Sequence, residues 1–415
     1  MLKRGAVLAV GLATAGTLLA APAGAAPVDA APGKPARITL PQLTGRHHVG
    51  TTDLHLVDRA RQDPWQPAAK RELMVTVTYP AARSGGARAA WMPPAFAQYV
   101  EDNFNPEIGM PPGSVDWGGV RRQSRDLAAV ERGRWPVVLF SHGFGTSREL
   151  NTVLTDDLAG HGYVVVSMSH PGDAMAVTFP DGRLVSNTID PSDQTAMKTA
   201  LDTRVADARF VLDEMTRLNR GANPDVERDA LPRGIVGTLD LSAVGMFGHS
   251  YGGFAAAETM YHDRRFDAGI NLDGGLAVGG DGEPGESTKH GVGRPFLLVG
   301  TDHVNPQTGQ RSSQTHLPAD SASWSRFWAN QRGWKRDLHF DRAAHSSFTD
   351  FQLPGMVALM PEPLRSTAVG TIDPLRSLTA QRDYVAAFFD LHLKHRNRHF
   401  FDRDNPKYPD TRFVP

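Results

Sequence analysis

Residues 243–257 read Ala-Val-Gly-Met-Phe-Gly-His-Ser-Tyr-Gly-Gly-Phe-Ala-Ala-Ala, and the fold prediction starts from this stretch. An apolar run ending at Phe247 predicts a buried strand, and the small residues after Phe254 begin a helical pattern. Between them, Gly248-His-Ser-Tyr-Gly252 has the Gly-x-Ser-x-Gly spacing that places a serine on a tight strand-to-helix turn. The glycines lack the Cβ atoms that would collide where strand and helix nearly touch. The stretch therefore predicts a nucleophile elbow with Ser250 as the nucleophile.

A serine hydroxyl is a poor nucleophile until a base takes its proton, so a histidine and an orienting acid are needed. In α/β-hydrolases the acid and then the histidine follow the nucleophile along the chain. His345 lies in a loop after a candidate strand that ends at Phe340, whereas His339 lies within that strand, where packing is expected to hold it. Two carboxylates, Asp273 and Asp302, follow strand-like runs. The pattern selects His345 as the base and leaves both carboxylates open as the acid.

Two backbone N–H groups are needed to stabilise the oxyanion that forms when the serine attacks a carbonyl. One normally belongs to the residue after the nucleophile, which is Tyr251 here. The other comes from a loop after an early strand. Pro136-Val-Val-Leu-Phe-Ser141 is such a strand, and it continues into the glycine-containing loop His142-Gly-Phe-Gly145. The sequence therefore predicts an oxyanion hole formed by the N–H groups of Phe144 and Tyr251.

Short β-rich runs alternate with longer helical patterns along the rest of the chain. Continuous apolar runs over residues 136–141 and 162–167 have the length of strands that are buried on both faces, as in parallel sheets. Residues 190–220 and 379–395 read as helices. The alternation predicts an α/β-hydrolase fold, with a mainly parallel central sheet and helices on both faces. No linker, repeat or charge block divides residues 42–415, so we expect a single domain there.

Residues 1–25 have the features of a secretory signal peptide. Lys3 and Arg4 precede an apolar run, and Ala23-Gly-Ala25 fits a signal-peptidase site. The apolar run is shorter than the roughly 18 residues that a membrane span requires. We therefore expect cleavage near Ala25, a secreted protein, and a flexible Ala- and Pro-rich leader over residues 26–41.

Composition excludes several classes of protein and site. The 415 residues include 44 Lys+Arg and 45 Asp+Glu, so no net charge attracts nucleic acid or an anionic membrane. The chain has no cysteine, which excludes disulfides and a catalytic thiol. The pair Asp302-His303 has no second cluster at ligand spacing, so we expect no metal. Acyl transfer by a serine also requires no organic cofactor.

Five stretches, taken in order, resemble those of one α/β-hydrolase family. They are Ser141-His-Gly-Phe-Gly145, Asp157-Leu-Ala-Gly-His-Gly-Tyr-Val-Val165, Gly248-His-Ser-Tyr-Gly-Gly253, Leu272-Asp-Gly274 and His345-Ser-Ser-Phe-Thr-Asp-Phe351. Together they resemble the plasma-type platelet-activating factor acetylhydrolase family, which has bacterial secreted members, over about residues 50–393. The His-x-x-Phe-x-Asp-Phe run is the most specific of the five.

The resemblance implies an answer to the choice that the pattern leaves open. In that family the acid follows the strand after the nucleophile unit, and Asp273 occupies this position, so the resemblance favours Asp273 over Asp302. It agrees with the base and the two oxyanion donors selected above. The animal enzymes have bulky apolar residues after the acid, whereas this chain continues with Gly274-Gly275. The shape of the acyl pocket and docking to lipoproteins or membranes are therefore not carried over.

These features predict a secreted serine carboxylic-ester hydrolase that acts on a small-molecule or lipid ester. The resemblance implies short-acyl esters, including phospholipids like platelet-activating factor. A lipase or cutinase-like polyester hydrolase is the alternative, since Trp91, Phe96, Tyr99 and Phe104 in residues 90–119 either line an acyl site or pack in the core. A non-catalytic binding protein with this fold is the alternative from another class.

Overall fold

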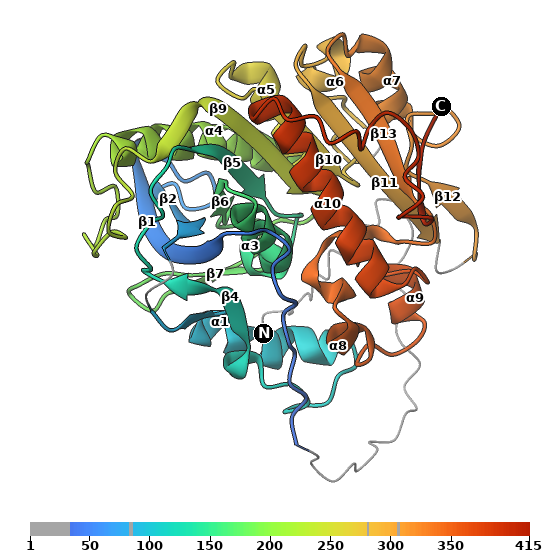
Figure 1. Ribbon diagram of the computed structural model, residues 1–415. Coiled ribbons are helices and arrows are strands. Elements are labelled where there is room, and N and C mark those ends of the chain that lie inside the picture. Colours follow the sequence, from blue (N-terminus) through green and yellow to red (C-terminus); the bar gives the residue numbers. More distant parts are fainter. Residues whose placement is uncertain (1–33, 83–85, 280–281, 305–307) are drawn as a thin grey trace.

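A mixed sheet of twelve strands organises the molecule (Figure 1). The computed structural model describes residues 34–82, 86–279, 282–304 and 308–415. The strands of this sheet are β1 (His48–Gln62), β2 (Lys70–Ala81), β3 (Arg88–Ala90), β4 (Arg121–Asp126), β5 (Trp135–Ser141), β6 (Val164–Met168), β9 (Leu239–His249), β10 (Ala268–Leu272), β11 (Phe296–Val304), β12 (Arg311–Ser313), β13 (Lys335–Phe340) and β14 (Thr411–Phe413). A separate two-stranded ribbon pairs β7 (Ala176–Thr178) with β8 (Leu184–Ser186).

The centre of the sheet is parallel, in the order β13-β11-β10-β9-β5-β6. Antiparallel strands flank it, with the β1–β2 hairpin beside β6 and β14 beside β13. The carboxyl ends of parallel strands meet at one edge of a sheet, so the segments that follow β5, β9, β10 and β11 lie at this edge. The predicted α/β class with a mainly parallel central sheet is confirmed.

Ten α-helices lie in the described part of the chain. They are α1 (Pro94–Tyr99), α2 (Asn105–Glu107), α3 (Thr152–Gly160), α4 (Gln194–Asn219), α5 (Tyr251–His262), α6 (Glu286–His290), α7 (Ala322–Asn330), α8 (Pro354–Val357), α9 (Leu364–Ala368) and α10 (Pro374–Leu393). The longest begins where Asp193 accepts a hydrogen bond from the N–H of Thr195 at 2.9 Å, which satisfies one of the free N–H groups of the first turn. None of these helices is long and apolar enough to cross a membrane.

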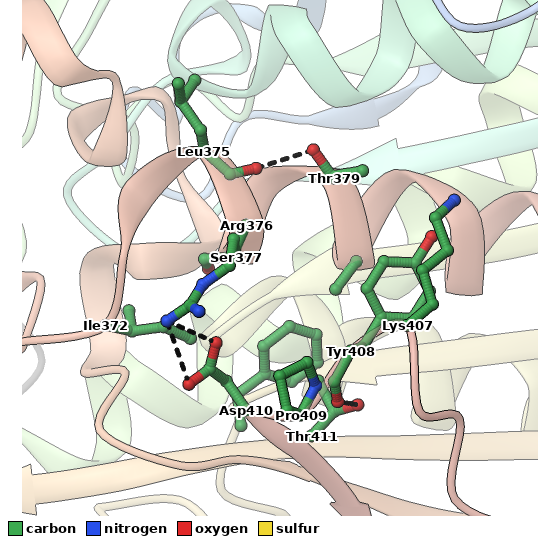
Figure 2. A pocket seen from close by; sticks show the side chains of 12 residues that line it. Ile372, Leu375, Arg376, Ser377, Thr379, Lys407, Tyr408, Pro409, Asp410 and Thr411 are labelled. Carbon is green, nitrogen blue, oxygen red and sulfur yellow. Dashed lines mark hydrogen bonds and ion pairs between the residues drawn. The ribbon is translucent and has the colours of Figure 1, made fainter.

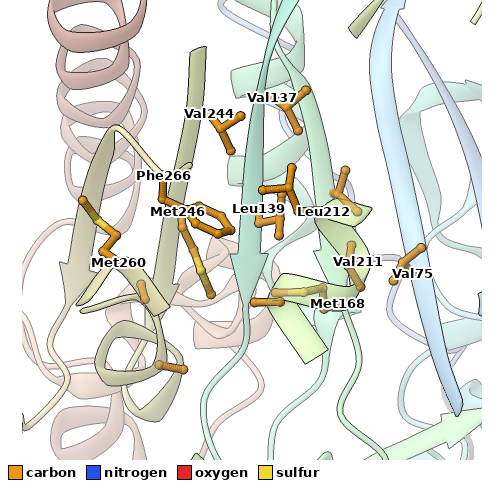
Figure 3. Packing of buried hydrophobic residues seen from close by; sticks show 14 of the residues in the cluster. Val75, Val137, Leu139, Met168, Val211, Leu212, Val244, Met246, Met260 and Phe266 are labelled. Carbon is orange, nitrogen blue, oxygen red and sulfur yellow. The ribbon is translucent and has the colours of Figure 1, made fainter. Parts of the chain in front are cut away.

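Helices cover both faces of the sheet because successive strand residues point to opposite sides. Val137 and Leu139 of β5 pack in a cluster with α4, α5 and α7, and Figure 3 shows them beside Leu212 of α4. Val138 and Phe140 pack in the other cluster, with α3 and α10. In Figure 1, α10 crosses in front of the strands.

The hairpin of β1 and β2 shows where the sequence pattern was too weak. The alternating run over residues 73–79 predicts part of β2, but no pattern predicts β1, which is 15 residues long. β1 includes buried polar residues such as His55, whose ring contacts Glu72 at 3.1 Å and Glu227 at 2.9 Å. A polar side chain buried by pairing with distant residues interrupts the apolar alternation that identifies a strand.

Part of the segment predicted to be a flexible leader, residues 26–41, packs against the rest of the chain in the structure. The N–H of Ala36 donates to the carbonyl of Ser114 at 2.7 Å, and Ile38 and Leu40 are buried. Apolar side chains at alternate positions give this short segment a surface that packs against the rest of the chain. The predicted signal peptide, residues 1–25, lies outside the described residues.

The aromatic residues of the 90–119 insertion belong to the core. Trp91, Phe96 and Phe104 are buried in a cluster that also includes apolar residues between positions 351 and 378. Phe104 stacks on Phe351, with the ring centroids 5.0 Å apart. Of the two interpretations of this insertion, core packing describes these three side chains.

Candidate active site

Ser250 connects the end of β9 to the start of α5 in a strained conformation. Its φ is 54° and its ψ is −124°, which few residues other than glycine adopt. The N–H of Ser250 donates to the carbonyl of Leu272 at 2.7 Å, which ties the turn to the end of β10. A Cβ on Gly252 would lie 2.0 Å from the carbonyl oxygen of Ser141, so only glycine fits there. These contacts form the nucleophile elbow that the sequence predicts.

Asp273 and His345 are in direct contact. His345 Nδ1 lies 2.6 Å from Asp273 Oδ2. The buried carboxylate also accepts hydrogen bonds of 2.9 Å from both the N–H and the hydroxyl of Thr301. Burial opposes its ionisation, but His303 and His345 outweigh this effect and lower the pKa of Asp273. An ionised Asp273 makes Nδ1 of His345 the protonated nitrogen and leaves Nε2 able to accept a proton.

Asp302 contacts a different histidine. His339 Nε2 lies 3.1 Å from Asp302 Oδ1, and the N–H of Arg342 donates to Oδ2 at 2.9 Å. His339 is fully buried in β13, as expected for the histidine that the sequence analysis set aside. The geometry therefore pairs Asp273, and not Asp302, with His345.

His249 links the elbow to the loop that bears His345. Its Nε2 lies 2.9 Å from the carbonyl oxygen of His345, and the two rings lie 4.6 Å apart. Burial and the neighbouring His345 lower the pKa of His249 to about 3, so this ring stays neutral and donates from Nε2. Sequence reasoning gave His249 no role, although its place in the Gly-x-Ser-x-Gly motif puts it beside Ser250.

The Ser250 hydroxyl makes no hydrogen bond to any other residue that the structure describes. Of the three predicted triad members, His345 and Asp273 are thus in direct contact. Ser250 is held near them by its own backbone hydrogen bond and by the neighbouring His249. Such catalytic hydrogen bonds often form only when substrate is bound.

The residues predicted to form the oxyanion hole lie together. The rings of Phe144 and Tyr251 meet edge to face, with their centroids 6.1 Å apart. Tyr251 is the first residue of α5, so its N–H has no acceptor within the helix. The N–H of Phe144 likewise has no acceptor among the described residues. A Cβ on Gly143 would lie 3.3 Å from Ser250 Cβ, which places this loop against Ser250.

Asp350, in the segment that follows His345, contacts the start of α3. Its two carboxylate oxygens each lie 3.3 Å from the N–H of Val153. Burial raises the pKa of Asp350 to about 7. This residue connects the loop of His345 to α3 without contacting the imidazole.

A pocket of about 210 Å³ lies beside the N-terminal part of α10, away from these residues (Figure 2). Its lining includes Ile372, Leu375 and Tyr408, and no predicted site residue. Within the described residues, no three His, Asp or Glu side chains gather in a way that would hold a metal ion.

Sequence comparison identifies the family. The family described as platelet-activating factor acetylhydrolase, isoform II, matches residues 33–407. The chain belongs to this family. The resemblance noted in the sequence is confirmed at that level, and so is the prediction of an ester-hydrolysing enzyme.

Known relatives agree with this assignment. A protein of Arthroderma benhamiae named "Probable 1-alkyl-2-acetylglycerophosphocholine esterase" is 26% identical over 409 residues, which cover 92% of this chain and 95% of that protein. The platelet-activating factor acetylhydrolase of Cavia porcellus is 22% identical over 254 residues, 57% of this chain and 53% of its own. The structure of a ferulic acid esterase from Streptomyces cinnamoneus superposes with a TM-score of 0.71 at 33% identity, covering 91% of this chain and 99% of that one.

Proposed function

We propose that this enzyme hydrolyses carboxylic esters with Ser250 as nucleophile, His345 as base and Asp273 as the orienting acid. The observation that carries the proposal is the 2.6 Å contact between His345 Nδ1 and Asp273 Oδ2, beside a serine on a strained elbow. Carboxylate, imidazole and serine in this order are what two-step acyl transfer requires.

The reaction begins when Nε2 of His345 takes the proton of the Ser250 hydroxyl, whose oxygen attacks the ester carbonyl. The N–H groups of Phe144 and Tyr251 stabilise the negative charge on the carbonyl oxygen. His345 then gives its proton to the leaving alcohol, and the acyl group remains on Ser250. Water attacks the acyl-enzyme by the same steps and releases the acid.

We propose short-acyl esters as substrates, including phospholipids like platelet-activating factor. The names of the relatives from Arthroderma benhamiae and Cavia porcellus support this choice. The structural neighbour named a ferulic acid esterase supports a second candidate class, esters of aromatic acids. A lipase or cutinase-like polyester hydrolase remains the alternative.

We also propose that the enzyme is exported and cleaved near Ala25, because the first 25 residues have the charge, apolar run and small-residue site of a signal peptide. N-terminal sequencing of protein recovered from the medium tests this proposal. A mature protein that still begins at Met1 would contradict it.

A fluorophosphonate probe tests the nucleophile, since it reacts irreversibly with an activated serine. We expect labelling of the wild-type protein and no labelling of Ser250→Ala. Ser346→Ala is the matched control, because Ser346 is a half-buried serine next to His345 that has no role in the mechanism. Labelling that survives Ser250→Ala would overturn the assignment, and a folded wild-type protein without labelling would favour the non-catalytic alternative.

A series of p-nitrophenyl esters, together with methyl ferulate, tests the substrate class. We expect kcat/KM to be highest for acetate or butyrate and to fall by tenfold or more at longer chains. A maximum at eight carbons or above would favour the lipase alternative, and preference for the ferulate would favour aromatic acids.

A further inference from the structure

Arg204 of α4 lies directly beneath the loop that carries Phe144. Its side chain is fully buried. It donates to the carbonyl oxygens of His142 and Gly143, the latter at 3.4 Å, and to the hydroxyl of Ser141 at 3.1 Å. We propose that Arg204 is the positioning residue of the oxyanion hole, an inference that rests on the function proposed above.

The first argument concerns the direction of the Phe144 N–H. In a trans peptide, the carbonyl of one residue and the N–H of the next point in opposite directions. Arg204 and the hydroxyl of Thr146, at 3.0 Å, both donate to the carbonyl of Gly143. Holding this carbonyl toward α4 turns the N–H of Phe144 away from α4. A Cβ on Gly143 would lie 3.3 Å from Ser250 Cβ, so the loop that presents this N–H also contacts Ser250.

The second argument is that Arg204 also contacts the other donor residue. Its guanidinium carbon lies 5.3 Å from the centre of the Tyr251 ring. The Tyr251 hydroxyl donates to the carbonyl of Met197, which lies about two helical turns before Arg204 in α4. The same helix therefore contacts both predicted oxyanion residues or their loop, although one lies in the loop after β5 and the other begins α5.

The third argument concerns charge. Asp173 balances Arg204 through two hydrogen bonds of 2.7 and 2.6 Å, and its carbonyl accepts from the N–H of Gly145 at 2.9 Å. Burial and Arg204 together lower the pKa values of His142 and His170, so both rings stay neutral. The forked guanidinium can bond a carboxylate and two carbonyls at once, which a lysine ammonium cannot do in the same geometry.

The test replaces Arg204 with Met and with Lys and measures hydrolysis of p-nitrophenyl acetate and of its thionoacetate analogue. Rates are expressed per site titrated to completion with the fluorophosphonate probe, so that unfolded protein is not counted. A thiocarbonyl sulfur is a weaker hydrogen-bond acceptor than a carbonyl oxygen, so the hydrolysis rate of the thionoester depends less on the oxyanion hole. Arg122→Met is the matched control, because Arg122 is also a buried arginine paired with an aspartate, Asp156, but belongs to β4.

We expect Arg204→Met to lower kcat for the oxygen ester by about 10²-fold, the effect of losing one oxyanion donor, with KM changed by less than threefold. We expect the rate ratio of oxygen ester to thionoester to fall at least tenfold. Arg204→Lys should show the same pattern with a smaller loss, near tenfold, and it decides the question if the Met variant does not fold. Arg122→Met should keep kcat per titrated site and the ratio within threefold of wild type.

Two results would overturn the inference while the proposed function stands. One is a kcat per titrated site within threefold of wild type in a folded Arg204 variant. The other is an equal loss for both substrates, which indicates general damage to the site. Absence of labelling at Ser250 in the wild-type protein would instead overturn the proposed function.

Discussion

The proposed triad and a second Ser–His–Asp row lie close together in this molecule. In the second row, here called the inner row, Ser141 Oγ lies 3.0 Å from His170 Nε2, and His170 Nδ1 lies 2.9 Å from Asp207 Oδ2. By hydrogen bonding alone, the inner row looks more complete than the proposed triad, in which the Ser250 hydroxyl has no such contact among the described residues. Its three residues are, however, fully buried.

The comparison shows that a row of hydrogen bonds does not define an active site. The hydroxyl of Ser141 also accepts a hydrogen bond from Arg204, and Asp207 is shared with Arg61 and Arg71. These contacts satisfy the inner row, whereas Ser250 is partly exposed on a strained turn beside free N–H groups. Access, strain and unsatisfied donors distinguish a reacting serine from a structural one.

The largest expected effect separates the two carboxylates that the residue pattern left open. We predict that Asp273→Asn lowers kcat about 10⁴-fold, because the base loses the acid that holds its tautomer. Asp302→Asn serves as the comparison and should keep kcat within tenfold, since Asp302 contacts His339. Steady-state kinetics with p-nitrophenyl acetate measures both. The reverse order of effects would move the acid to Asp302.

Substitutions in the inner row should change the stability of the folded protein rather than its catalytic rate. Breaking a buried ion pair leaves a charge without its partner, so Asp207→Asn should lower the free energy of unfolding by about 3–5 kcal/mol. Asp213→Asn, which breaks an exposed pair with Arg265, should cost less than about 1 kcal/mol. Denaturant titration measures both changes. A catalytic inner row would instead lower kcat per titrated site by 10³-fold or more in Asp207→Asn.

A smaller effect is expected at the other end of the inner row. Ser141→Ala removes a hydroxyl that contacts His170 and Arg204, and should lower the free energy of unfolding by about 1–3 kcal/mol. Fluorophosphonate labelling of Ser250 should persist in this variant. Complete loss of labelling in a folded Ser141→Ala protein would contradict the structural role assigned here.

Asp350 extends the comparison to a buried carboxylate whose contacts only partly offset the cost of ionising it. Burial raises its pKa to about 7, above its value in the unfolded chain, although Val153 and Arg382 favour ionisation. The folded state therefore binds the proton more tightly, and this stabilisation is present at low pH and lost as pH rises toward 7. The stability of wild type relative to Asp350→Asn should fall between pH 5 and pH 7 by at most about 1.4 kcal/mol per pH unit. Denaturant titrations of both proteins at pH 5, 6, 7 and 8 measure this difference, and parallel pH profiles would refute it.

The local part of the site was readable from the sequence because it depends on neighbouring residues. A strand, five residues with two glycines, and a helix are contiguous, and their sterics permit the turn at Ser250 only in this pattern. Buried parallel strands are also recognisable in the sequence as continuous apolar runs. These two signals predicted the α/β class, the elbow and the loop of Phe144.

The residue pattern left the acid open and the family resemblance favoured Asp273, but only the tertiary structure shows the contact with His345 and what supports the oxyanion loop. Asp273 directly follows β10 and Asp302 lies near the end of the adjacent strand β11, so the order of the chain gives them similar places at the sheet edge. The loop after β13 places His345 against Asp273, whereas His339, within β13, lies against Asp302. Arg204 lies about 60 residues from the loop it holds, and a contact over that separation leaves no periodic signal in the sequence. Local sterics are encoded in adjacent residues, whereas long-range pairing of buried charges exists only once the chain has folded.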